Sequence, residues 1–314
     1  MKLYVYRARM ANFGDELNEW LLPKIFPNFF DNAPDPLFLG IGSILFNHHP
    51  KDVRKIVFGS GYGGYTAPPV FDDNWSIYCV RGPRTAAMCG IGEDRVSGDT
   101  AILIGCHRPA PPKKTVRFGF IPHWESVERG NWPKVCALTG IRYIDPTRSV
   151  DEVLEDLESC DVVIAEAMHG AIVADALRIP WIPVLPFDTA HHNKWLDWSE
   201  ALGIHLRPHR IAPSSTREMV LSHLQREASR LKRPRGLFKV GVKGLDSILI
   251  QEAARRLDRL SRAEPQLSAD SAIADCVDRL ESFAAQIRRD FDGASVATIR
   301  TDATGVDRIS DPSP

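Results

Sequence analysis

The chain lacks long apolar runs, paired cysteines and an excess of either charge, and each absence excludes a class of protein. Its 314 residues include 39 Lys and Arg against 40 Asp and Glu, a net charge of −1. This balance argues against a generally basic nucleic-acid-binding protein and against an acidic disordered chain. No apolar run reaches the ~18 residues that a membrane-spanning helix needs. The first seven residues indicate a strand, not a signal peptide. We therefore expect a cytoplasmic protein that binds no nucleic acid.

The six cysteines include no CxxC pair and no short Cys/His spacing typical of zinc sites. We expect reduced thiols in the protein core. Asp188 lies close to His191 and His192 in the sequence, but this spacing matches no compact zinc motif. The sequence therefore predicts no metal site and no bound cofactor.

Short apolar strands alternate with helical segments, which predicts parallel sheets covered by helices. The expected strands fall into two series: residues 3–6, 37–39, 55–58 and 76–80, then 116–121, 142–144, 161–165 and 181–185. The expected helices include residues 15–25, 84–89, 150–159 and 170–178. Ser149 and Glu152 fit a capping box at the start of the third helix.

The two series meet at a Pro-rich, basic stretch, residues 108–114, which is typical of a linker. We expect an N-terminal α/β domain over residues 1–109 and a second α/β domain over residues 114–210. A basic linker and helical appendage would cover residues 211–292, with a helix break near Pro265, and residues 293–314 would form a disordered tail.

Residues 226–243 contain seven basic residues and one acidic residue, a local charge of +6. Apolar side chains alternate with the Lys and Arg residues between positions 231 and 250. Such a segment could lie on an anionic membrane surface, where each basic residue adds ~1 kcal/mol. The simpler interpretation, a solvated linker, is favoured.

Ligands of parallel α/β sheets bind at the carboxyl ends of the strands, so the residues after each strand are the candidates. Glycines there allow close approach of a ligand to the backbone. Gly14 precedes Asp15 after the first strand, in N-F-G-D-E-L-N, and Asp15 sits where it can cap a helix or act on a ligand. Gly42, Ser43 and Gly61 follow later strands. Their spacing fits neither a dinucleotide fingerprint nor a P-loop.

Charged residues follow three further strands. Arg81 and Arg84 flank a Gly-Pro pair, and an arginine fork suits a phosphate or a carboxylate. His169 follows a buried strand at the expected start of a helix, next to Gly170, where an imidazole can assist a leaving group. Glu166 is placed to orient His169, to act as a base, or merely to form an ion pair.

Two weaker candidates complete the site. His123 follows the strand 116–121, and Lys194 follows the last strand of the second series. Either side chain could face a cleft between the two α/β domains.

Taken together, these segments resemble the polysaccharide pyruvyl transferase family, in particular its exopolysaccharide branch of succinoglycan-type ketal-pyruvate transferases. The likeness runs over residues 1–206 and rests on ordered pieces, among them N-F-G-D-E-L-N, G-I-G-S-I-L, V-R-G-P-R-T, G-D-T-A-I-L, E-A-M-H-G-A-I-V-A-D-A-L-R-I-P-W and K-W-L-D-W. The resemblance implies two Rossmann-like domains facing across a cleft, as in GT-B-type glycosyltransferases.

The resemblance also implies the chemistry. Phosphoenolpyruvate would be the donor, a pair of sugar hydroxyls on a lipid-linked oligosaccharide the acceptor, and a pyruvate ketal the product. In that reaction His169, with Asp15 or Glu166, would be catalytic. Arg81, Arg84 and the glycine-rich turns would bind the donor. His123 and Lys194 would contact the acceptor. The enzyme would work in the cytoplasm or peripherally on the inner membrane, without a metal.

One position departs from the family. Many relatives outside this branch carry an Arg two residues before the His of the fourth motif, where this chain has Ala167. Arg81, Arg84, Arg178 and Lys194 are the alternatives for the missing phosphate contact. Two other functions stay open at this point: a GT-B-type glycosyltransferase that uses a sugar nucleotide, and a non-catalytic scaffold of a polysaccharide assembly complex.

Overall fold

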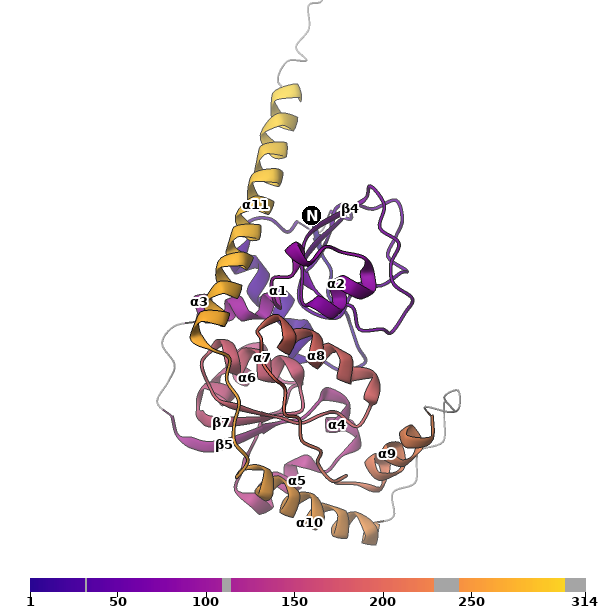
Figure 1. Cartoon of the computed structure of the whole chain (residues 1–314), viewed down its shortest axis with the longest axis vertical. Helices are drawn as coiled ribbons and strands as arrows, with labels where there is room; N and C mark the ends of the chain where they lie inside the picture. Colours follow the sequence, from indigo (N-terminus) through magenta and orange to yellow (C-terminus); the bar gives the residue numbers. More distant parts are fainter. Residues whose placement is uncertain (32, 109–113, 229–242, 303–314) are drawn as a thin grey trace, which may run out of the picture.

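The computed structural model describes residues 1–31, 33–108, 114–228 and 243–302. Two four-stranded sheets, both entirely parallel, form its centre, and helices pack around them (Figure 1). This mixed α/β architecture is the one predicted from the alternation of strands and helices. The expected GT-B-like placement of two domains across a cleft stays a prediction.

The first sheet has the strand order β1-β2-β3-β4, which is also the order along the chain. Its strands are β1 (Lys2–Leu3), β2 (Leu37–Leu39), β3 (Lys55–Ser60) and β4 (Trp75–Val80). The accompanying helices are α1 (Phe13–Ile25), α2 (Pro83–Cys89), η1 (Glu93–Arg95), η2 (Thr100–Leu103) and α3 (Ile104–His107). Because the strand order never reverses, this half has no topological switch point.

The second sheet has the order β6-β5-β7-β8, so the chain reverses direction across the sheet between β5 and β7. Its strands are β5 (Val116–Ile121), β6 (Arg142–Tyr143), β7 (Cys160–Ala165) and β8 (Trp181–Pro183). Its helices are α4 (Trp124–Arg129), α5 (Trp132–Thr139), α6 (Val150–Glu158), α7 (Met168–Ala176), η3 (Thr189–His191) and α8 (His192–Ala201). Such a reversal opens a crevice at the carboxyl ends of the two central strands. The loops after β5 and β7 therefore lie at the predicted position for a ligand.

All eight expected strands are present, and the four expected helices agree within two residues at each end. Strands β1 and β8 are each two residues shorter than expected, because they end at Leu3 and Pro183. The amide of Tyr4 still donates to the Phe38 carbonyl oxygen at 2.9 Å. The predicted capping box at Ser149 and Glu152 is formed. All six cysteines lie in the described part of the chain, are free, and with the exception of Cys106 are buried, as expected.

The two sheets pack against each other through helices. One hydrophobic cluster contains Phe13 of α1 and Ile102 of η2 together with Ile121 of β5 and Ile172 of α7, all nearly inaccessible to solvent. The amide of Phe13 also donates to the Pro146 carbonyl oxygen at 2.8 Å. The amino-terminal ends of α1 and α7, one from each half, therefore lie close together.

The C-terminal region contacts both halves. Helix α9 (Thr216–Ala228) lies near α4, α10 (Lys243–Leu260) packs on α5, and α11 (Asp270–Asp302) runs along η2 and β4 (Figure 1). The predicted helix break near Pro265 is confirmed, because it falls between α10 and α11. Helix α11 continues to Asp302, past the expected start of a disordered tail at residue 293. Residues 303–314 lie outside the described chain.

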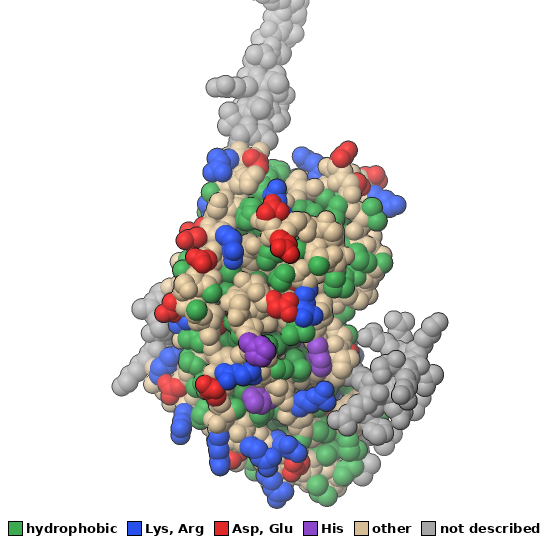
Figure 2. All heavy atoms as spheres, viewed as in Figure 1, with side chains coloured by type: hydrophobic (Ala, Val, Ile, Leu, Met, Phe, Trp, Pro, Cys, Tyr) green, Lys and Arg blue, Asp and Glu red, His purple; other side chains and the backbone are tan. Residues whose placement is uncertain are grey.

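Most of the basic segment, residues 229–242, also lies outside the described residues, so its contact with a membrane stays a prediction. On the face drawn in Figure 2, Lys and Arg side chains gather toward the end of the molecule at which α10 lies. Within the described residues, no helix combines the length and the apolarity needed to cross a bilayer.

Candidate active site

His169 lies on the first turn of α7, and its imidazole packs on the backbone of α1. A methyl group added at Gly14 would come within 2.0 Å of His169 Nδ1, so only glycine leaves room for the ring. The Nε2 atom lies 3.6 Å from Oδ2 of Asp99, just beyond hydrogen-bond distance, and has no other partner among the described residues. His169 therefore presents a buried, unsatisfied ring nitrogen where the two halves meet.

Asp99 is the acid beside His169, and it is fully buried before η2, where its side chain caps the amide of Ala101. Burial alone would raise its pKa, but His169 and Arg81 outweigh this effect and hold the pKa of Asp99 below its usual value. Asp99 is thus a carboxylate that steadies both His169 and Arg81. The sequence motif G-D-T-A-I-L contained it, but Asp99 was not among the predicted site residues.

Arg81 follows β4 and is completely buried. Its Nε donates to Asp197 Oδ2 at 2.9 Å, and one terminal nitrogen donates to Ser43 Oγ at 3.0 Å and lies 4.0 Å from Asp99 Oδ2. The guanidinium lies against Gly61, where a methyl group would come within 2.1 Å of Cζ. Its second terminal nitrogen has no partner among the described residues. Arg81 is therefore fixed by two carboxylates and a serine, with one donor left open.

Asp197 of α8 is the second acid that the sequence analysis missed. Besides Arg81 it accepts hydrogen bonds from the amide and the hydroxyl of Thr85, at 2.8 and 2.7 Å. It lies within the K-W-L-D-W piece of the sequence. Its role depends on Arg81, which is 116 residues away in the chain, so local spacing carried no signal.

Arg84 does not point into this cluster. Its guanidinium makes two bonds to Glu200, at 2.8 and 2.7 Å, and a third to Asn193 at 3.2 Å. The side chain is more than one-third exposed. Arg84 therefore connects α2 to α8 at the surface, which is a structural position and not the donor-binding position expected from the sequence.

Asp15 lies on the first turn of α1, close to His169. Asn12 donates to its carboxylate at 2.8 Å, and the position of a methyl group on Gly42, which has φ +121°, lies 3.8 Å from it. Burial raises the pKa of Asp15, although Asn12, His169 and Lys194 oppose the increase. A carboxyl group with a raised pKa beside an imidazole suits proton transfer.

Lys194 of α8 is a partly buried cation with no hydrogen bond or ion pair within the described chain. Burial and the nearby Arg81 lower its pKa to about 8, against the opposing effect of Asp15, Glu125 and Asp188. Its charge therefore lies within electrostatic reach of Arg81 and of three carboxylates, Asp15, Glu125 and Asp188. A partly buried lysine without a hydrogen-bond or ion-pair partner among the described residues is suited to bind an anionic ligand.

Glu166 and Gly170 have positions other than those expected for ligand contacts. Glu166, after β7, is fully buried and accepts the amide of His123 at 2.8 Å and the hydroxyl of Ser126 at 3.0 Å. It thereby fixes the start of α4, and burial raises its pKa to about 8. A methyl group on Gly170 would come within 2.7 Å of Ile121, so this glycine allows α7 to pack on β5.

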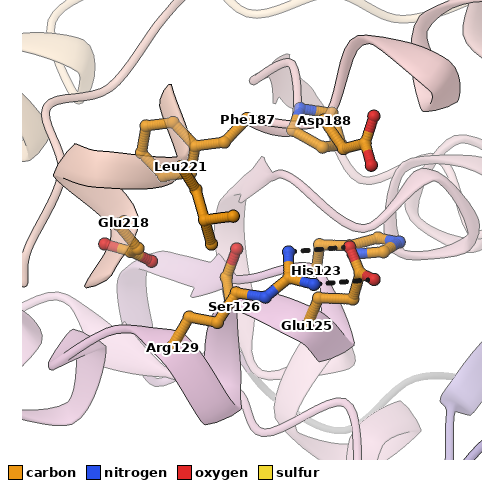
Figure 3. Close-up of a pocket in the computed structure, with 9 residues that line it drawn as sticks. His123, Glu125, Ser126, Arg129, Phe187, Asp188, Glu218 and Leu221 are labelled. Atoms are coloured by element: carbon orange, nitrogen blue, oxygen red, sulfur yellow. Dashed lines mark hydrogen bonds and ion pairs between the residues drawn. The ribbon is translucent and has the colours of Figure 1, made fainter. Parts of the chain in front are cut away.

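A second polar cluster follows β5 and includes His123. Its ring lies beside that of His191, 4.6 Å between centroids, and both approach the carboxylate of Glu125. Arg129 donates two bonds of 3.0 Å to Glu125, as Figure 3 shows, with His123 next to the pair. Burial lowers the pKa of both histidines, so their rings are mainly neutral near pH 7. Glu125 and His191 were not predicted as site residues.

Arg178, one alternative for the missing arginine, lies beyond the opposite end of α7. Its guanidinium binds Ser268, on the segment between α10 and α11, and Asp270, the first residue of α11. Ala167, the position where relatives carry the Arg, precedes His169 at the start of α7. Arg178 is therefore far along the helix from the position it would have to replace.

Comparison with known proteins gives two matches. A model of the family "Polysaccharide pyruvyl transferase" matches residues 12–186, a range that includes every predicted site residue apart from Lys194. The chain is also similar to the succinoglycan biosynthesis protein ExoV of Rhizobium meliloti (strain 1021), with 34% identity over 93% of this chain and 100% of that protein. No solved structure matches.

Proposed function

The chain belongs to the polysaccharide pyruvyl transferase family, and from this membership and the site geometry we propose that it makes a pyruvate ketal from phosphoenolpyruvate. The acceptor would be a pair of hydroxyls on a lipid-linked oligosaccharide of exopolysaccharide biosynthesis. The family match and the similarity to the succinoglycan protein support a transferase in this process. The donor and the ketal product are the proposal.

The observation that carries the proposal is a surplus of unsatisfied donors at one place. His169 Nε2, one nitrogen of Arg81 and Asp99 Oδ2 are buried without a partner among the described residues, and the His169 and Arg81 groups lie 3.6 and 4.0 Å from that oxygen. One unpaired acceptor therefore stands beside two unpaired nitrogens. Lys194 acts on the same region as an unpaired cation. Buried donors normally have acceptors, so a bound anion with several oxygens would satisfy them. Phosphoenolpyruvate has both a phosphate and a carboxylate.

Lys194 is the strongest substitute for the arginine that relatives carry at the position of Ala167. Arg81 is held by Asp197 and Ser43, Arg84 by Glu200, and Arg178 by Ser268. Lys194 alone among the four alternatives has no hydrogen-bond or ion-pair partner within the described chain. We assign it to the phosphate of the donor, a role different from the acceptor contact expected from its sequence position.

Asp15 is the better of the two carboxyl groups for proton transfer. Glu166 is buried, and both of its oxygens are occupied by the start of α4. Asp15 lies beside Gly42 and within electrostatic reach of His169 and Lys194. We therefore assign proton delivery to the donor methylene carbon to Asp15, and stabilisation of the departing phosphate to His169 and Lys194.

The reaction balances with these groups. The methylene carbon of phosphoenolpyruvate gains a proton, which leaves C2 electrophilic. One sugar hydroxyl attacks C2 and releases its proton, and a second hydroxyl then forms another C2–O bond as the bond from C2 to the phosphate oxygen breaks. Of the two hydroxyl protons, one replaces that given to the methylene carbon and the other leaves with the phosphate.

The direct test incubates the purified protein with phosphoenolpyruvate and lipid-linked oligosaccharides, and follows acceptor mass and free phosphate together. Pyruvyl transfer predicts one ketal gained per phosphate released, and loss of both in a folded His169→Ala variant. Transfer from a sugar nucleotide instead would support the glycosyltransferase alternative. A cell strain that keeps its ketal when Arg81 and His169 are both replaced, at normal protein levels, would support a scaffold.

A further inference from the structure

Three potential metal ligands converge beside the proposed donor site. His123 precedes α4, Glu125 lies on its first turn, and His191 ends η3, so they come from two separate loops of the second half. One ligand atom from each residue lies within 4.8 Å of the other two. Glu125 Oε2 is 3.4 Å from His191 Nε2 and 3.8 Å from His123 Nδ1.

Two of these separations, 3.4 and 3.8 Å, are close to those of a coordination shell, and the ligand atoms of His123 and His191 lie within 4.8 Å of each other. Tetrahedral zinc with bonds of ~2.0–2.1 Å places its ligand atoms roughly 3.4 Å apart. The contact of His123 Nδ1 with Glu125, at 3.8 Å, is too long for a hydrogen bond. A hydrogen-bonded network therefore accounts for the approach of His191 to Glu125. His123 is held beside them by its ring contact with His191 and by its backbone amide, without a hydrogen bond to Glu125.

We propose that His123, Glu125 and His191 bind one divalent first-row transition metal ion such as Zn²⁺. Two histidines and one carboxylate form a donor set that such ions prefer over Mg²⁺, which favours oxygen ligands. Three protein ligands leave coordination positions open, as in catalytic sites. Binding of the ion does not depend on the proposed pyruvyl transfer.

The surroundings supply the supports that a metal site requires. The hydroxyl of Tyr65 lies 2.8 Å from His191 Nδ1, which orients the ring so that Nε2 faces Glu125. His123 is buried, and its backbone amide is fixed by Glu166. Hydrogen bonds to the parts of a histidine that do not bind the metal orient the ring and determine which nitrogen is free to coordinate.

Two neighbouring cations, Arg129 and Lys194, oppose the ion, and Arg129, which binds Glu125 directly, provides a discriminating test. Its guanidinium donates to both oxygens of Glu125 at 3.0 Å, so an ion on Oε2 must share that atom with a cation or displace it (Figure 3). Removing the positive charge at Arg129 should therefore strengthen metal binding. A site in which Glu125 served only as the partner of Arg129 would show no such gain.

The experiment titrates the full chain, after chelation and dialysis, with Zn²⁺ by calorimetry and with Co²⁺ by its visible spectrum. We expect one ion per chain, at least tenfold weaker binding in Glu125→Gln and in His191→Ala, tighter binding in Arg129→Gln, and no binding of Mg²⁺. His192→Ala is the matched control, because the neighbouring imidazole contacts only the Pro186 carbonyl oxygen among the described residues; its affinity should equal that of the wild type.

Equal melting temperatures of the metal-free variants would show that lost binding does not come from lost folding. If a ligand variant fails to fold, the Arg129→Gln titration decides on its own. The proposal is overturned if no ion binds, if binding survives both ligand substitutions, or if Arg129→Gln leaves the affinity unchanged or weaker.

Discussion

Replacement of Lys194 by methionine should stabilise the ligand-free protein and weaken its binding of phosphoenolpyruvate. Methionine keeps the length and apolar stem of lysine but removes the charge. In the structure this charge has no partner among the described residues, and burial together with Arg81 lowers its pKa from 10.5 to about 8. The native protein therefore holds a cation in a place that disfavours it.

The stability gained by Lys194→Met can be worked out from the lowered pKa of Lys194. One pKa unit corresponds to ~1.36 kcal/mol, so holding Lys194 protonated costs at most about 3 kcal/mol of folding free energy near pH 7. Because the pKa is lowered on folding, this cost is complete below pH 8 and disappears as the pH rises toward 10.5. The free-energy advantage of Lys194→Met over the wild type should shrink over the same range.

The same substitution should have the opposite effect on donor binding, which it should weaken. A hydrogen bond to a charged group contributes ~1.5–3 kcal/mol, so its loss should raise the KM for phosphoenolpyruvate roughly 10- to 100-fold. In the wild type this KM should be flat below pH 8 and rise about tenfold per unit above it, since only protonated Lys194 binds the anion. Lys194→Arg, which stays charged, should keep the KM flat to higher pH.

Two measurements check this reasoning: urea unfolding at pH 7 and at pH 10 without ligand, and initial rates of phosphate release against donor concentration. A Lys194→Met protein that unfolds at lower urea than the wild type at pH 7 would show that the charge is not held at a cost. A KM unchanged in Lys194→Met, with normal kcat, would remove Lys194 from the donor site.

Three further substitutions test the site around His169. His169→Ala should lower kcat by ~10²–10⁴-fold with little change in melting temperature, measured by phosphate release and thermal unfolding. Gly14→Ala should reduce kcat in the same direction, because the added methyl group lies 2.0 Å from His169 Nδ1 and displaces the ring; activity equal to the wild type would show that the ring position is unimportant. Glu166→Gln tests a structural role through pH: burial raises the pKa of Glu166 from 4.5 to about 8, so the protonated form favours folding, and stability relative to the variant should fall by up to about 5 kcal/mol between pH 4.5 and 8. Urea midpoints with the same pH dependence in both proteins would contradict this assignment.

Local sequence patterns were sufficient for the eight strands and for helices α1, α2, α6 and α7, but they did not single out α3, α4, α5, α8 or α9. Apolar runs marked the eight strands, and the cap formed by Ser149 and Glu152 marked the start of α6, because each of these signals lies within a few residues. The order of the strands did not follow from those patterns. The reversal between β5 and β7 depends on which strands pair, and pairing is a property of the whole chain.

The candidate site likewise combines features that local sequence indicates with features that depend on residues far apart in the chain. Position after a strand made Arg81, His169 and Asp15 candidates, because ligands bind at the carboxyl ends of parallel strands. The structure brings the three side chains close together across two sheets: Asp15 and Arg81 follow strands of the first sheet, and His169 follows a strand of the second. Their partners were not predictable from spacing: Arg81 is matched by Asp197, 116 residues away. The reason is electrostatic: a buried arginine needs carboxylates close to it in the folded structure, and these can come from any part of the chain.

The C-terminal helices have a closer relation to the site than an appendage would have. Ser268, between α10 and α11, donates through its amide and hydroxyl to Asp175 near the end of α7, at 2.8 and 2.5 Å. Asp175 also accepts a hydrogen bond from the indole N–H of Trp181 in β8 at 2.8 Å, and Arg178 donates to the Ser268 hydroxyl. The carboxyl end of α7 is therefore fixed by the chain segment that joins α10 to α11, whereas its amino end rests on Gly14 of α1. A helix held at both ends keeps His169 in one orientation before any ligand binds, and such preorganisation is what a group that stabilises a departing phosphate requires.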